Sequence, residues 1–186
     1  MPLLAETLVD EWLNRQGFFT IRGIKDGVEE IDLLGVRLTS TGLEGWHVEV
    51  QASFRPIGYV SKLTEELALS LGKKRTSVWE RPPDILTQCV HAWVSDKFTR
   101  KDKVAARQRA WPGICWQHYF VHGAVRYEAE LVMIQECGIA VVPLHQVLTE
   151  VCTRVGKGSP GAAGTDFADL MDYYEKHSRK SLQAAA

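Results

Sequence analysis

The most informative segment of the chain is "VEEIDLLGVRLTSTGLEGWHVEVQAS", residues 28–53. Apolar and β-branched residues fill both of its ends, and "TSTGLEG" separates them, so the pattern predicts two antiparallel strands joined by a turn. Asp32 lies in the first strand, Glu49 in the second, and Gln51 two residues later. These polar side chains either form a site or occupy the solvent-exposed face of a hairpin, on which alternating acids are ordinary.

Further elements are predicted on both sides of this hairpin by apolar spacing and by glycine and proline breaks. The N-terminal segment has helical spacing and ends at Gly17, and residues 73–86 are basic and then proline-rich, with no clear assignment. We expect strands at 18–25, 30–38, 46–53, 89–98 and 114–123, helices at 59–72, 99–111 and 126–138, and a strand that runs into a short helix at 139–151.

The order of these elements predicts an α/β fold. The first three strands suit an antiparallel meander, and from residue 89 the alternation of strands and helices favours parallel strands with covering helices. We therefore expect one domain over residues 1–155, with a central mixed sheet (antiparallel meander plus parallel strands) flanked by helices. The composition of 156–164, "GKGSPGAAG", predicts a flexible linker.

A C-terminal helix and tail are predicted over 165–186, after this linker. The helix has an apolar stripe, which could dock on a second copy of the chain in a homodimer, on a partner protein, or on its own domain. The sequence leaves these alternatives open.

The overall composition sets limits on function. The 186 residues include 22 Lys and Arg and 23 Asp and Glu, a formal charge of -1. With no global basic excess, binding to DNA must depend on local clusters. No apolar run approaches the length of a membrane span, and the N-terminus does not resemble a signal peptide. We therefore expect a cytoplasmic protein that does not bind a membrane.

The cysteines and histidines match no structural metal site. The four cysteines are far apart in sequence and form no C-x-x-C pair, so we expect reduced and mostly buried thiols rather than disulfides or a zinc site. His47, His91, His118 and His122 lie in predicted strands without zinc spacing and are interpreted as packed or surface residues.

The two acids of the hairpin can lie close together. Asp32 and Glu49 are on adjacent strands, so their carboxylates can face each other across the ladder at a distance of a few ångströms. A hard divalent cation such as Mg²⁺ would relieve their repulsion. Gln51 shares a strand face with Glu49, and Glu6 lies near the apolar face of the first helix, where a carboxylate needs a partner. The pattern thus allows a metal site, and strand spacing alone is equally compatible with a solvent-exposed hairpin face.

This order of helix, Asp-bearing strand and E-x-Q strand resembles the PD-(D/E)XK nuclease superfamily, which has the restriction-endonuclease-like fold, over about residues 1–152. Glu6 matches the glutamate of the family's first helix, and "EIDLL" supplies the aspartate as Asp32. "VEVQ" matches the (D/E)XK strand, with Glu49 as the acid and Gln51 in the place of the usual lysine. The later stretch "ELVMIQECGIAVVPLHQVLTEV" is similar to the closing helix–strand–helix of Mrr-like members.

The resemblance implies a metal-dependent DNA endonuclease that hydrolyses phosphodiester bonds. Asp32 and Glu49 would bind Mg²⁺, with Mn²⁺ as a substitute, and Gln51 and Glu6 would complete the catalytic set. Gln51 carries no positive charge and cannot act as a base, so Lys62 on the next predicted helix is a candidate for the missing cation. The alternative is a catalytically inactive nuclease-fold module that binds DNA or a protein, in a defence or mobile-element system.

Two basic clusters, "GKKR" and "RKDKVAARQR", are candidates for contacts with the DNA backbone. A solvated helix face explains the second cluster equally well. Lys103 and Arg107 are four residues apart and share a face of the predicted helix. The residues predicted to bind nucleic acid are Lys73, Lys74, Arg75, Arg100, Lys101, Lys103 and Arg107.

Overall fold

The computed structural model describes residues 2–26 and 29–153. The predicted linker at 156–164 and the predicted C-terminal helix and tail at 165–186 lie outside the described residues.

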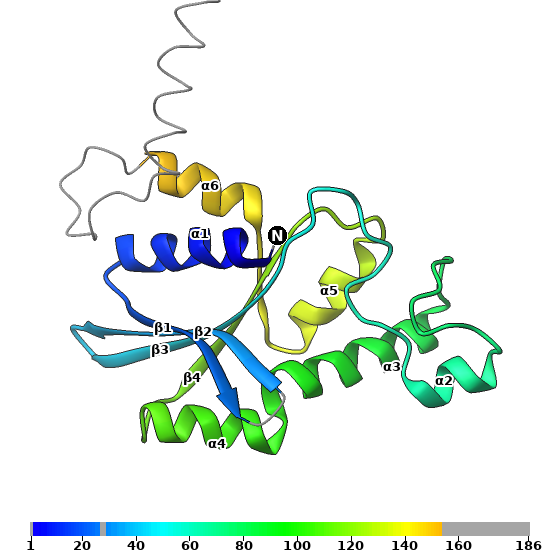
Figure 1. Ribbon diagram of the computed structural model, residues 1–186, viewed down its shortest axis with the longest axis horizontal. Coiled ribbons are helices and arrows are strands. Elements are labelled where there is room, and N and C mark those ends of the chain that lie inside the picture. Colours follow the sequence, from blue (N-terminus) through cyan, green and yellow to red (C-terminus); the bar gives the residue numbers. More distant parts are fainter. Residues whose placement is uncertain (1, 27–28, 154–186) are drawn as a thin grey trace, which may run out of the picture.

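A five-stranded mixed sheet forms the centre of the fold (Figure 1), in the order β1-β2-β3-β4-β5. The first three strands form an antiparallel meander, and β4 and β5 continue the sheet in parallel from β3. This confirms the predicted α/β class with a mixed sheet flanked by helices. The strands are β1 (Phe19–Asp26), β2 (Glu29–Thr39), β3 (Gly42–Gln51), β4 (Trp116–His122) and β5 (Ala140–Pro143).

Helices cover both faces of this sheet (Figure 1). The helices α1 and α6 lie together on one face, and α4 lies on the other. The helices are α1 (Pro2–Arg15), α2 (Glu65–Ser70), α3 (Pro83–Val94), the π-helical turn η1 (Ser95–Thr99), α4 (Lys101–Ala110), α5 (Ala129–Glu136) and α6 (Leu144–Thr153).

The apolar core is divided between the two faces. On the α1 side, Val9 and Leu13 pack with Val48 and Val121 of the sheet and Val147 of α6. On the α4 side, Ile31, Leu34 and Ala106 form a smaller cluster. Burial of this apolar area is the main stabilising contribution to the fold.

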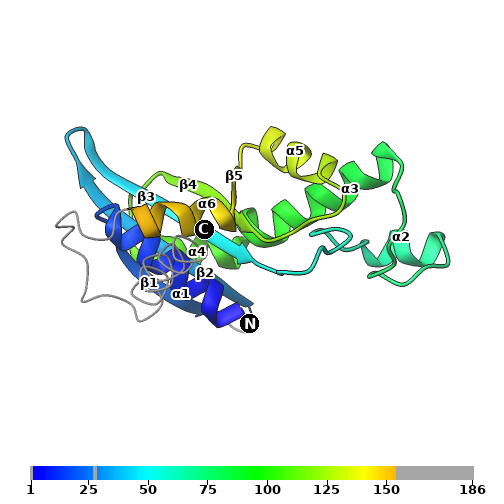
Figure 2. The same ribbon diagram turned by 90° about the horizontal axis from the view of Figure 1, so that it is seen from above.

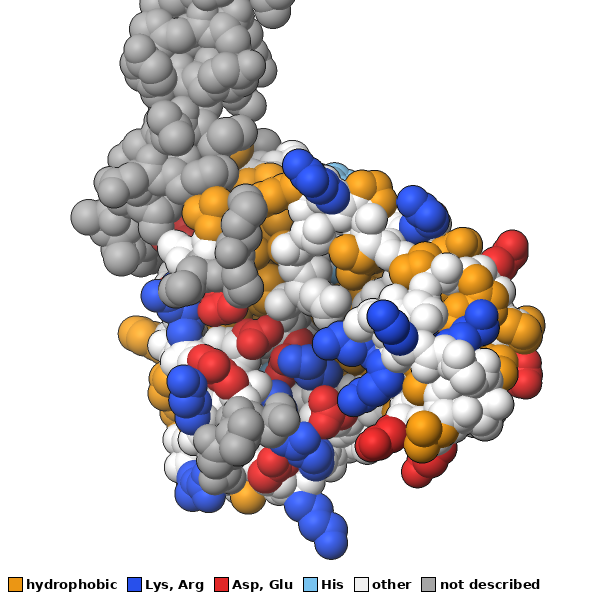
Figure 3. All heavy atoms as spheres, turned by 45° about the vertical axis from the view of Figure 1, so that its right-hand side comes forward, with side chains coloured by type: hydrophobic (Ala, Val, Ile, Leu, Met, Phe, Trp, Pro, Cys, Tyr) orange, Lys and Arg blue, Asp and Glu red, His pale blue; other side chains and the backbone are white. Residues whose placement is uncertain are grey.

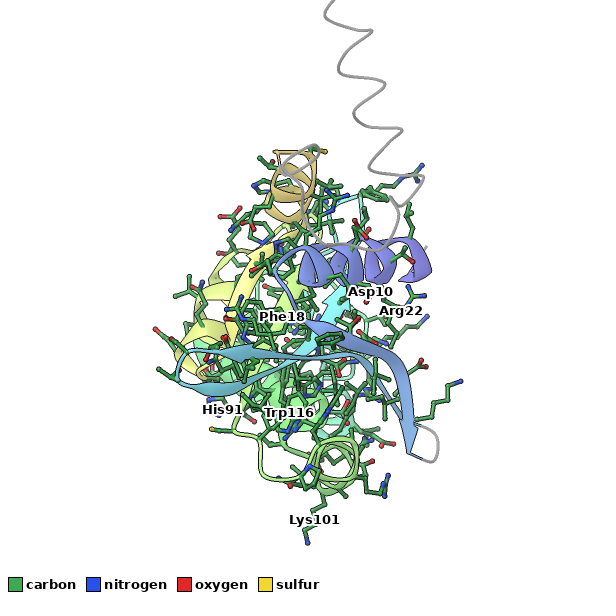
Figure 4. The ribbon with its side chains drawn as sticks, turned by 90° about the vertical axis from the view of Figure 1, so that its left-hand side faces the viewer. Asp10, Phe18, Arg22, His91, Lys101 and Trp116 are labelled. Atoms are coloured by element: carbon green, nitrogen blue, oxygen red, sulfur yellow. The ribbon has the colours of Figure 1, made fainter. Side chains whose placement is uncertain are left out.

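The edge strand β1 is tied to α1 by polar contacts. Asp10 of α1 and Arg22 of β1 lie next to each other (Figure 4), with Arg22 Nε 3.7 Å from Asp10 Oδ2. A partly exposed pair of this kind contributes little to stability, so it orients the helix on the sheet rather than holding the fold.

The helix α3 extends to one side of the sheet and carries α2 at its far end (Figure 2). A cluster that includes Val60, Val90, Phe98, Phe120 and Ile134 joins this extension to β4 and α5. The site described below lies next to this junction.

The predicted strand at 89–98 is wrong. The segment is rich in β-branched and aromatic residues, but it forms the end of α3 and the turn η1. Leu86, Cys89 and Val90 are buried at helical spacing, and a proline at the first helical turn suits a helix start. The expected alternation therefore loses its first strand, since α3, η1 and α4 follow one another before β4, whereas the helix–strand–helix–strand–helix order from α4 onward and the parallel strands β4 and β5 are as predicted.

The predicted helix at 59–72 is also too long. Only Glu65–Ser70 is helical, and Thr64 caps it by accepting a hydrogen bond from Leu67 N at 3.2 Å. Residues before Thr64 are held outside the helix by tertiary hydrogen bonds, such as Leu63 N to Arg75 O at 3.0 Å. Tertiary pairing here overrides local helix propensity.

The cysteines form no disulfide among the described residues. The free thiols are Cys89, Cys115, Cys137 and Cys152, of which Cys89 is buried and Cys115 is exposed.

Among the helices of residues 2–26 and 29–153, none is both long and apolar enough to cross a bilayer.

A glycine is required at position 123, just after β4, because the backbone there lies against the segment that follows β3. Its N–H donates to Gln51 O at 3.1 Å, and the next residue donates to Ser53 O at 2.8 Å. A Cβ at Gly123 would overlap the backbone of Ser53. We expect Gly123→Ala to lower the free energy of unfolding by about 1–3 kcal/mol, as overpacking does. Urea unfolding measures this, and an unchanged midpoint would show that the two backbones can separate without cost.

Candidate functional site

The site lies where β2 and β3 separate. Their pairing ends at Leu33 opposite Val48, although both strands continue past these residues. Asp32 Oδ2 accepts a hydrogen bond from Val50 N at 2.7 Å. The side chain thus satisfies a backbone donor that would otherwise be unpaired next to the core, and this bond fixes the position of the carboxylate.

A cavity of about 140 Å³ opens at this point. All four residues that the sequence predicted as catalytic contribute to it, from three different elements. The remaining lining residues come from β3, α3, η1 and β4. The lining consists of Glu6, Asp32, Glu49, Val50, Gln51, Trp93, Lys97 and Phe120.

Three nitrogen donors hold the Glu49 carboxylate, which is 1% exposed. Its Oε1 lies 3.0 Å from His47 Nε2 and 2.9 Å from Lys103 Nζ. Its Oε2 accepts from Lys97 Nζ at 2.8 Å. Burial acts to raise the pKa of Glu49, but the His47 hydrogen bond and the two ammonium groups outweigh it and lower the pKa to about 2. Glu49 is therefore ionised at neutral pH.

The proton on His47 is fixed by Arg107. Arg107 Nη1 lies 2.7 Å from His47 Nδ1 and also donates to Phe98 O at 2.7 Å. Because a guanidinium can only donate, Nδ1 must accept, and the ring proton is on Nε2, where it is donated to Glu49. Burial lowers the pKa of His47, so the ring is neutral. His47 thus orients Glu49 and is more than a packed histidine.

The Asp32 carboxyl group has the opposite electrostatic environment. Burial, and then the negative charge of Glu49, raise its pKa from 3.8 to about 7, although the Val50 N–H and Lys97 act to lower it. Near neutral pH the group is therefore close to half-protonated. A positive charge beside Asp32, in addition to that of Lys97, would stabilise its ionised form.

The variant Asp32→Asn is expected to be more stable than the parent at about pH 8, by about 1–3 kcal/mol. Because the pKa is higher in the folded state, protonated Asp32 stabilises the fold below pH 3.8, and this stabilisation is lost as the pH rises through about 7. Asparagine has no charge to bury, and its oxygen can still accept from Val50 N. Urea unfolding at several pH values measures the difference, which should shrink toward pH 4. A difference that does not change with pH would contradict the raised pKa.

The donor set fits one hard cation. An ionised carboxylate has about four acceptor positions, and Glu49 uses three of them, so one remains on Oε2. Within the described residues, Asp32 Oδ1 has no hydrogen-bond partner. No group of three or more His, Cys, Asp or Glu side chains in these residues is arranged to hold a metal. A cation would therefore depend on Asp32, Glu49 and water, as Mg²⁺ often does.

Lys97 of η1 is a partly exposed cation that contacts Glu49 and lines the cavity beside Asp32. Burial acts to lower its pKa, but Glu49 and other acids outweigh this effect and raise it above the ordinary value. Lys62 is exposed and lines the adjoining groove, not the cavity. The sequence missed Lys97 because residues 89–98 read as a strand, and only helical spacing in that segment could have indicated it.

The basic cluster on α4 is largely used inside the protein. Lys103 is 3% exposed and Arg107 is 6% exposed, so these two residues cannot contact a phosphate in this conformation, contrary to expectation. They share a helix face as predicted, but that face covers Glu49 and His47. Arg100 Nη2 pairs with Asp102 at 2.7 Å, and its Nη1 pairs with Asp96 at 2.7 Å.

The other predicted phosphate contacts lie at the surface. Lys101 points away from the body of the protein (Figure 4), and Lys74 is also exposed. Lys73 Nζ lies 4.6 Å from the centre of the Trp79 ring. On the face shown in Figure 3, basic and acidic side chains lie next to one another rather than in separate patches.

Comparison with known proteins adds little to this geometry. No protein-family model matches the chain, and no curated protein matches it. A solved structure described as "Crystal Structure of Protein of Unknown Function AF1548" is similar over 74% of this chain, with 15% sequence identity and a TM-score of 0.39. The chain spans 55% of that protein's length.

Proposed function

We propose that the chain is a metal-dependent DNA endonuclease of the PD-(D/E)XK superfamily that hydrolyses phosphodiester bonds. One observation carries the proposal. Glu6, Asp32, Glu49 and Gln51, which match the family pattern in sequence, line the same small cavity together with Lys97. This convergence is not expected of acids that merely alternate along a wet strand face.

Each residue has a role that follows from its surroundings. Asp32 and Glu49 would hold the cation, and Mg²⁺ bound there would supply a Lewis acid that polarises the phosphate and acidifies a water molecule. The Gln51 amide would orient the attacking water, and Glu6 would help to position the two carboxylates. Lys97, which remains protonated, supplies the positive charge that Gln51 lacks and stabilises charge that develops on the phosphate.

A second candidate is a non-catalytic module of the same fold that binds DNA or a protein, in a defence or mobile-element system. The observation that favours it is that two ammonium groups and His47 already bind the Glu49 carboxylate. Lys97 and Lys103 already neutralise this carboxylate at 2.8 and 2.9 Å, as a structural ion-pair network would, and a cation has to compete with them.

Metal binding and cleavage separate the two candidates. The nuclease proposal expects cleavage of DNA in Mg²⁺ or Mn²⁺ and none in EDTA, tested on linear, circular, branched and single-stranded substrates. Calorimetric titration with Mn²⁺ should show binding that Asp32→Asn weakens at least tenfold, a loss of about 1.4 kcal/mol. Asn keeps the bond to Val50 N and so preserves the local structure. Absence of both Mn²⁺ binding and cleavage would favour the module.

A further inference from the structure

A groove of about 630 Å³ adjoins the small cavity. The two share Gln51, Trp93 and Lys97. A ligand that lies in the groove therefore reaches the carboxylates of Asp32 and Glu49 past the Lys97 ammonium. The volume of the groove is within the range of sites that bind small molecules.

Two cations of the groove have free donors. Lys62 is exposed and makes no hydrogen bond or ion pair with the described part of the chain. Arg75 donates from Nε to Leu63 O at 2.9 Å, which fixes the guanidinium and leaves its terminal nitrogens without a partner among the described residues. Together with Lys97 these groups line one groove with positive charge, which suits a phosphate backbone.

Trp93 provides a rigid aromatic surface between the groove and the cavity. Its ring centre lies 4.7 Å from that of Phe120 and 5.9 Å from that of Phe98, at interplanar angles of 67° and 73°. These two contacts hold the indole in place, while the side chain remains partly exposed and lines both spaces. Aromatic side chains held in this way stack on unpaired bases.

The groove does not suit a duplex. Glu65 and Glu66, at the start of α2, and Asp96, which pairs with Arg100, line the groove together with the cations. These acids would repel a second phosphate backbone. A duplex would require a broad basic face, but Lys103 and Arg107 are buried in internal bonds and Arg100 is paired with acids.

We propose that this groove binds single-stranded DNA, with one backbone along Lys62, Arg75 and Lys97 and a base against Trp93, so that the site acts on a single-stranded substrate or region. The inference rests on the proposed nuclease function for its consequence in catalysis, but binding in the groove can be measured without any cleavage.

The test measures binding in EDTA, where metal-dependent cleavage cannot occur. Fluorescence anisotropy is recorded with a labelled DNA strand of about 12 nucleotides and with the matching duplex, at several salt concentrations. We expect the single strand to bind at least tenfold more tightly. Lys62→Ala and Arg75→Ala should each weaken binding several-fold and reduce the salt slope by about 0.7. Lys25→Ala, which removes an exposed cation on β1 outside the groove, is the matched control.

Trp93→Leu should weaken binding about tenfold through lost stacking. Trp93 also packs on Phe98 and Phe120, so its replacement could disturb the fold. Lys62→Ala changes an exposed side chain and therefore tests binding independently of folding. Equal or tighter binding of the duplex, or no effect of Lys62→Ala, would overturn the inference while leaving duplex cleavage open. If the protein bound the single strand more tightly but cleaved no DNA with any metal, binding in the groove would be supported and the proposed nuclease activity would be contradicted.

Discussion

On the proposed nuclease function, Lys97→Met is expected to lower the rate of Mg²⁺-dependent DNA cleavage by about 10²–10³-fold, the effect of removing one preorganised charge that stabilises a transition state. Lys97 Nζ lies 2.8 Å from Glu49 Oε2 and lines the same cavity as Asp32. Its raised pKa keeps it charged, so it acts as a fixed cation and not as a base. Single-turnover rates at saturating DNA measure the effect.

Two further variants make this result specific. Lys97→Arg retains the charge and should recover part of the rate. Lys62→Met removes a lysine from the adjoining groove and should act through DNA affinity, raising KM while changing kcat by no more than a few-fold. If Lys97→Met cleaved as fast as the parent, and Lys62→Met did not, the charge would have to come from Lys62 as the sequence suggested.

Glu49→Ala is expected to lower the free energy of unfolding by about 3–5 kcal/mol, because removing one partner of a buried ion pair leaves the other charge uncompensated. The stranded charge is Lys103, which is 3% exposed and lies 2.9 Å from Glu49. The double variant Glu49→Leu with Lys103→Met should recover most of the loss. Urea unfolding at neutral pH measures all three proteins.

Glu44→Ala is the matched control for this prediction. Glu44 is on the same strand and pairs with Arg37 at 2.7 Å, but both side chains are partly exposed, so its loss should cost about 1 kcal/mol or less. A Glu49→Ala variant as stable as Glu44→Ala would show that Lys103 is solvated or relaxes. Loss of activity in Glu49→Ala combines an unstable fold with a lost ligand, so Asp32→Asn is the cleaner test of metal binding.

Local patterns were sufficient for much of the fold. The alternation in residues 28–53 predicted β2 and β3, and the same strand geometry predicted that Glu49 and Gln51 share a face with Asp32 nearby. The pattern failed at residues 89–98, where aromatic and β-branched residues suit either a strand or a buried helix. Packing of Val90 and Phe98 against β4 and α5 decided for the helix.

Periodicity and turns within short stretches were enough to predict the mixed sheet and the acids beside its diverging strands. The cations that surround these acids could be identified only from the packed structure. Lys97, Lys103 and Arg107 are far from Glu49 and His47 in sequence, and surface helices carry similar residues. These cations are buried or partly buried because a buried carboxylate is stable only with opposite charge and hydrogen bonds around it. No local sequence pattern indicates which cations will supply them.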